Sequence, residues 1–121
     1  MRPLTNQELH NLAMNIVGRQ LEAEGYEFRA VNSKPGKNPQ FVCSRGKKLH
    51  FIVVRPVAFP NDPKVYDESL MKKVADHAQK FNGHAFYAGV GLSNAKDRTQ
   101  PVLLDQEYIV DFHGLIGMND G

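Results

Sequence analysis

The segment at residues 49–55, Leu-His-Phe-Ile-Val-Val-Arg, restricts the fold more than any other part of the chain. Its β-branched and aromatic side chains are those enriched in strands, and the run has the character of a central strand. The tight-turn sequence Arg-Gly-Lys-Lys at residues 45–48 precedes it and follows a shorter strand-like segment at residues 40–44. These three segments together predict an antiparallel hairpin.

The register of this hairpin follows from its turn. With Gly46 and Lys47 at the tip, Gln40 lies opposite Val53, and side chains alternate between the two faces of the sheet. One face is then expected to carry Gln40, Val42, Leu49, Phe51, Val53 and Arg55, and the other Phe41, Cys43, His50, Ile52 and Val54.

The rest of the chain predicts two helices and three further strands. Thr5 and Glu8 form a capping box that starts a helix, and Gly25 is suited to ending it. A second helix is expected over residues 67–81 and strands over 26–32, 84–92 and 107–112, whereas the prolines predict irregular structure over 56–63 and a polar loop fills 93–106. The order α-β-β-β-α-β-β predicts one α/β (α+β) domain, residues 1–121, in which two helices flank a mixed sheet.

Composition excludes several classes of protein. A single cysteine, Cys43, allows no internal disulfide, and no apolar run approaches the roughly 20 residues of a membrane-spanning helix. The N-terminal residues lack the apolar core of a signal peptide, so a cytoplasmic location and no membrane partner are the default expectations. Gly89-Val90-Gly91 opens no helix, which favours close backbone packing or a β-bulge over phosphate binding.

Positive charge is concentrated in the first half of the chain. Residues 1–60 contain nine Lys and Arg against four Asp and Glu, and the net charge of the whole chain is +2. The candidate anion-binding groups are Arg45, Lys47, Lys48 and Arg55. The alternative interpretation is a set of solvated loop residues.

The hairpin resembles a known family. Gly25-Tyr26 and the segment at residues 39–55, PQFVCSRGKKLHFIVVR, are similar to the PD-(D/E)XK nuclease superfamily, most closely to a small group of uncharacterised proteins related to Holliday-junction resolvases. That group reads roughly G-E-I-D-L-I-x-x-D-G-x-x-L-x-F-V-E-V-K over this hairpin. The likeness covers roughly residues 9–82 and implies a restriction-endonuclease-like core.

The resemblance places the chemical positions of that family on residues that cannot perform its chemistry. The metal-binding Asp falls on Gln40, the Glu on Val53 and the Lys on Arg55. The Asp and Glu of the family hold Mg²⁺, which prefers charged oxygen ligands, and the metal stabilises charge on the phosphate. An amide, an isopropyl group and a guanidinium offer no such ligands, so we expect neither metal nor cofactor at this degenerate site.

Two other sets of residues are candidates for chemistry. Cys43 and His50 are expected to face each other across the hairpin, although two ligands are too few for a structural zinc site and a lone Cys is usually a small core residue. Asp62, Asp67 and Glu68 are candidates for relocated carboxylates that rebuild a metal pair.

These observations favour a catalytically inactive nuclease-like domain that serves as a binding or assembly module. Its expected partner is a second copy or another protein, with nucleic acid as a weaker candidate. The alternative is a metal-dependent nuclease whose carboxylates have moved. An electron-transfer role ranks last, because an iron–sulfur cluster needs four cysteines and the chain has one.

Overall fold

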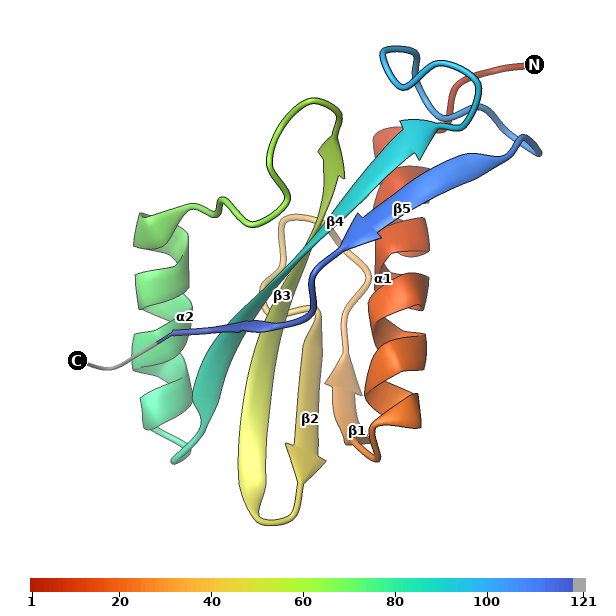
Figure 1. Cartoon of the computed structure of the whole chain (residues 1–121). Helices are drawn as coiled ribbons and strands as arrows, with labels where there is room; N and C mark the ends of the chain where they lie inside the picture. Colours follow the sequence, from red (N-terminus) through yellow and green to blue (C-terminus); the bar gives the residue numbers. More distant parts are fainter. Residues whose placement is uncertain (119–121) are drawn as a thin grey trace.

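A computed structural model of the chain describes residues 1–118. It contains two helices and a mixed sheet that lies between them (Figure 1). The elements are α1 (Asn6–Ala23), β1 (Glu27–Val31), β2 (Phe41–Arg45), β3 (Lys48–Ala58), α2 (Glu68–Gln79), β4 (His84–Asn94), β5 (Tyr108–Phe112) and β6 (Ile116–Gly117). The strand order is β1-β2-β3-β4-β5, and β6 also pairs with β4. The predicted single α+β domain with its mixed sheet is therefore confirmed.

Local signals in the sequence set both ends of α1. The side chain of Thr5 accepts a hydrogen bond from the backbone N–H of Glu8, and the Glu8 carboxylate accepts one from the N–H of Thr5. Gly25 has φ +86°, the left-handed conformation that residues with a Cβ rarely adopt, just beyond the last turn. The predicted capping box and the predicted stop are both present.

The hairpin of β2 and β3 has the predicted register. Phe41 pairs with Ile52, and Cys43 pairs with His50. Ile52 and Val54 on one face of β3 pack under α1, whereas Phe51 and Val53 on the other face pack under α2. The alternation expected from the sequence therefore divides the core into two layers, one on each side of the sheet.

β3 and β4 form the only parallel pair among the described strands, and α2 lies on the connection between them. Parallel strands joined in this way end at the same edge of the sheet. Ligands of open α/β sheets bind in the crevice outside those carboxyl ends, which here are near Ala58 and Asn94.

The expected break at Pro56 is wrong, because β3 continues to Ala58 and Pro56 pairs with Val90. The carbonyl of Ile52 accepts a hydrogen bond from the backbone N–H of Gln40, and the N–H of Val54 donates one to the Gln40 side chain. Both residues therefore form these hydrogen bonds on the β2 side of β3. Pro56 has the same orientation in the strand, but β2 begins only at Phe41 and offers no partner there. The missing N–H of proline therefore costs no ladder hydrogen bond.

Two features of β4 link it to distant segments. A Cβ added to Gly89 would collide with the carbonyl of Pro63, so this glycine allows the loop after β3 to lie directly on the strand. This confirms the close packing predicted for the Gly89-Val90-Gly91 segment. The short strand β6, which the sequence did not reveal, pairs with β4 through Phe86 and Tyr87.

Candidate functional site

The structure brings Gln40 and Arg55 together at the edge where β2 begins. The Oε1 atom of Gln40 accepts hydrogen bonds from the backbone N–H of Val54 at 2.8 Å and from Nη1 of Arg55 at 3.3 Å. Its Nε2 atom donates to the carbonyl of Lys37 and to Oδ1 of Asn38, both at 3.1 Å. Arg55 also donates to Asn38 Oδ1 at 2.8 Å. The buried amide of Gln40 therefore has all of its hydrogen bonds inside the protein.

Gln40 extends the sheet where the backbone of β2 can no longer do so. Its backbone N–H donates to the carbonyl of Ile52 at 3.0 Å, and its side chain takes the next position in the ladder by accepting from Val54. The residue is fully buried. These contacts give Gln40 a structural role, and its neutral amide offers no anionic oxygen.

Val53 lies on the other side of the sheet from α1. It is fully buried among Met71, Val74 and Tyr87, in the layer beneath α2. A hydrocarbon side chain in an apolar layer contributes packing and no ligand atom. Of the three residues that the sequence resemblance singled out, the structure joins Gln40 to Arg55 and leaves Val53 in the core.

Two of the three candidate relocated carboxylates accept hydrogen bonds from the nearby backbone. Asp62 accepts from the N–H of Lys64 at 2.9 Å, and Asp67 caps α2 by accepting from the N–H of Leu70 at 3.0 Å. Burial lowers the pKa of the Arg55 guanidinium, and the negative charge of Asp67 opposes this by raising it. Among residues 1–118, no group of three or more His, Cys, Asp and Glu side chains is placed to hold a metal ion.

The four predicted anion-binding residues do not form one patch. Arg45, Lys47 and Lys48 lie around the exposed hairpin tip, where Arg45 stacks over the ring of Tyr26 at 4.5 Å. Arg55 lies seven residues along β3 from Lys48, about 23 Å away at the rise of an extended strand. The hairpin tip and Arg55 are therefore separate sites.

Cys43 and His50 face each other across the hairpin, as the register predicted, but their surroundings are apolar. Burial raises the pKa of the Cys43 thiol to about 11, so the reactive thiolate is disfavoured at neutral pH. The His50 ring stacks on Phe86 at 4.7 Å between ring centroids and meets the edge of Tyr26 at 4.9 Å. Both side chains serve as core packing here.

A cavity of about 610 Å³ opens beside α1 at the carboxyl ends of β3 and β4, and we call it the His10 cavity. Its walls come from the start of α1, the end of β3 and the loop after β4. The lining residues are Leu4, Asn6, Leu9, His10, Pro35, Arg55, Pro56, Val57, Ala58, Phe59, Leu92, Arg98, Thr99, Gln100, Pro101 and Val102. This is the crevice position at which open α/β sheets bind ligands.

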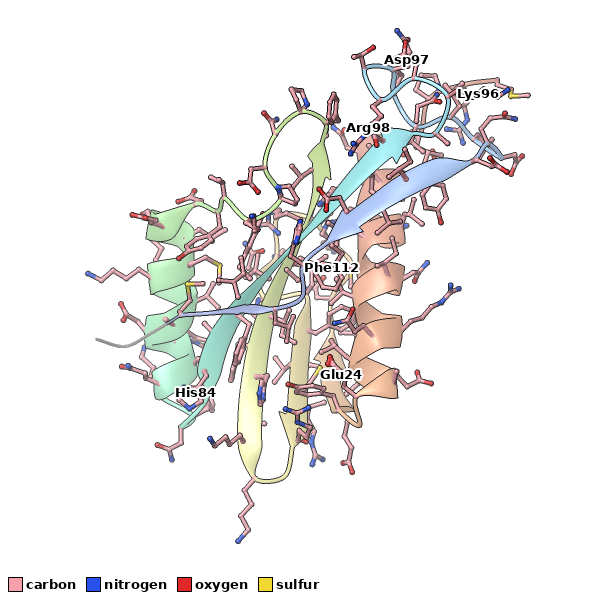
Figure 2. All side chains as sticks on the ribbon, in the orientation of Figure 1. Glu24, His84, Lys96, Asp97, Arg98 and Phe112 are labelled. Carbon is pink, nitrogen blue, oxygen red and sulfur yellow. The ribbon has the colours of Figure 1, made fainter. Side chains whose placement is uncertain are left out.

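Two residues of this cavity, His10 and Arg98, are not among the site residues predicted from the sequence. His10 lies on the buried stripe of α1, three residues before Ala13 and seven before Val17. A polar residue within an apolar helical stripe was the signal that could have identified it. Arg98 lies in the loop between β4 and β5, and a loop has no periodic pattern from which the burial or neighbours of a residue can be predicted. Figure 2 shows Arg98 between the end of β4 and the loop after β3.

Comparison with known proteins places the chain in a family. A family model described as a domain of unknown function, DUF8840, matches residues 7–118, and the chain belongs to this family. Searches of curated proteins and of solved structures found no match. Within the described residues, no helix is long and apolar enough to cross a membrane.

Proposed function

We propose that this chain is a non-catalytic binding or assembly domain built on a scaffold related to the PD-(D/E)XK nucleases. The observation that carries the proposal is the hydrogen bonding of Gln40. Its amide completes the β3 ladder and contacts Arg55 at the position where a nuclease of that superfamily needs a carboxylate. The order of elements and the register of the hairpin support the scaffold.

The chemistry of phosphodiester cleavage explains why this arrangement favours binding. Negative charge builds on the phosphate oxygens during attack, and a metal held by carboxylates stabilises it. Gln40 is neutral, Val53 is apolar and Arg55 is cationic, so this group of residues would repel a divalent cation. A protein partner or a second copy of the chain is the first candidate for an assembly role, and nucleic acid is the second.

The test is a cleavage assay with supercoiled plasmid, linear duplex and four-way junction DNA in Mg²⁺ or Mn²⁺. We expect no products above a buffer control even when the protein is in molar excess over the DNA. Metal-dependent cleavage that is lost in Asp62→Asn, Asp67→Asn or Glu68→Gln would support the relocated-site nuclease instead. Light scattering over a range of concentrations tests assembly, for which a twofold dimer is the expected form.

A further inference from the structure

The His10 cavity is lined by two arginines and by no carboxylate. Arg55 and Arg98 border it, and no Asp or Glu is among the residues that line it. The ion pairs within residues 1–118 join Arg2 to Glu8, Arg29 to Glu27 and His113 to Asp111, so neither cavity guanidinium is paired with a carboxylate. Arg98 is exposed and Arg55 is half-buried, and the positive potential of two arginines with no carboxylate beside them favours a ligand that brings negative charge.

Arg98 is the cation available to such a ligand. Its guanidinium carbon lies 4.5 Å from the centroid of the Phe59 ring, and its Nε donates to Oγ of Ser93 at 3.3 Å. Among the described residues its two Nη groups have no hydrogen-bond partner, whereas those of Arg55 donate to Asn38, Gln40 and the carbonyl of Val54. Arg98 is therefore held at the rim by β4 and the loop after β3 with its donor fork unused (Figure 2).

His10 supplies a second polar group on the α1 side of the cavity. The residue is 1% exposed, and its Nε2 atom has no hydrogen-bond partner within the described chain. Burial and the positive charge of Arg55 lower its pKa, which favours the neutral imidazole. A buried nitrogen without a hydrogen-bond partner is destabilising, and a polar atom of a ligand that reached it would remove that cost.

The remaining lining determines what kind of molecule fits. Leu4, Leu9, Leu92 and Val102 provide aliphatic surface, and the cavity volume of about 610 Å³ falls in the range of small-molecule sites. One unused guanidinium fork matches one carboxylate, which accepts two parallel hydrogen bonds from it. A phosphate ester would call for more donors than this mainly aliphatic recess presents.

We propose that the His10 cavity binds a small amphipathic carboxylate. The carboxylate lies on the Nη groups of Arg98 at the rim, and the apolar body extends inward between α1 and β4, within reach of His10. The inference rests on the proposed function in that it assigns a ligand to a binding domain. It identifies the ligand by its chemistry as one anionic end and one aliphatic or aromatic body.

The experiment uses the full chain labelled with ¹⁵N, with sodium octanoate as the probe and octan-1-ol as its neutral counterpart. Octanoate should shift the amide signals of residues 9–10, 98–100 and 102, and calorimetry should give it a Kd at least about tenfold lower than that of octan-1-ol. Arg98→Gln should weaken octanoate about tenfold or more and leave octan-1-ol unchanged, since only the charge-assisted contact is lost. Arg45→Gln, which removes an exposed cation at the hairpin tip, is the matched control and should bind octanoate like the parent.

A second variant keeps the test decisive if Arg98→Gln perturbs the loop. Leu92→Trp fills the cavity from β4, and if its spectrum stays dispersed it should abolish the binding of both probes. Equal affinities for octanoate and octan-1-ol, no saturable shifts at millimolar octanoate, or stronger shifts of the same amides by inorganic phosphate or a short oligonucleotide would each overturn the inference. DNA cleavage by the parent would instead contradict the proposed function while leaving octanoate binding intact, so the two failures are distinguishable.

Discussion

Gln40 and Arg55 are joined by a 3.3 Å hydrogen bond, and the same Gln40 oxygen also accepts from the backbone N–H of Val54 at 2.8 Å. One side chain thus continues the sheet beyond the start of β2 and also holds the guanidinium of Arg55, a residue that lines the His10 cavity. Gln40, which the sequence resemblance aligns with a metal-binding position, is thus part of the hydrogen-bonded framework of this chain.

Gln40→Leu should lower the free energy of unfolding by about 1–3 kcal/mol, because the N–H of Val54 would be left buried without a partner. Urea denaturation monitored by far-UV circular dichroism measures the change. Gln20→Leu is the control, because Gln20 is exposed on α1 and its side chain donates a hydrogen bond to the Glu24 carboxylate at 3.3 Å. A Gln40→Leu protein as stable as the control would mean that the amide does not support the ladder.

The double substitution Gln40→Asp with Val53→Glu should destabilise the protein by about 3–5 kcal/mol, because it introduces an uncompensated buried charge at the fully buried Val53. Added Mn²⁺ should recover part of that loss, since the metal would bind the two new carboxylates if they share a site. The parent should show no change in thermal midpoint with Mn²⁺. If Mn²⁺ does not change the thermal midpoint of the double variant, that result would count against the nuclease-like correspondence of these positions.

Gly89→Ala should cost about 1–3 kcal/mol or more, because the added methyl would press on the Pro63 carbonyl and lie 2.8 Å from a ring carbon of Tyr87. Gly36→Ala is the matched control, since an added Cβ there has no atom within 4 Å and φ lies outside the left-handed region. The two midpoints in urea give the comparison. Equal stability of the two variants would show that the loop after β3 moves away from β4 at little cost.

The free energy of unfolding should decrease as the pH falls below about 6.5. Burial between Tyr26 and Phe86 lowers the pKa of His50 from its ordinary value of 6.5, so the unfolded chain takes up a proton at higher pH than the folded one. His50→Phe keeps an aromatic ring in this place and should reduce the slope of stability against pH between pH 7 and 5. Between pH 7.5 and 8.5 both states hold neutral imidazole, and there the two proteins should have parallel profiles. An unchanged slope below pH 6.5 in His50→Phe would exclude His50 as its source.

Short-range patterns were sufficient to predict most of the elements. The capping box of Thr5 and Glu8, the left-handed Gly25 and the turn at Gly46 each involve neighbours in the chain, and all lie where they were expected. The register of the hairpin followed in the same way, because a tight turn determines which residues face each other.

Contacts between distant segments accounted for the errors. Proline is excluded from a strand only at positions where the neighbouring strand requires a backbone N–H. Whether β2 extends far enough to lie beside Pro56 could not be predicted from the residues around it. The two-residue strand β6 forms because the edge of β4 at Phe86 and Tyr87 is free to pair with it. The residues of β6 alone do not predict a strand.

The sequence alone determined where the helices and the hairpin lie and that Gln40, Val53 and Arg55 cannot bind Mg²⁺, because side-chain chemistry and short-range periodicity are properties of the chain. Only the tertiary structure decided that Gln40 completes the ladder and that His10, from the start of α1, and Arg98, from the loop after β4, border one cavity. These two residues are far apart in the chain, and the packing of α1 on the sheet brings them to the same place.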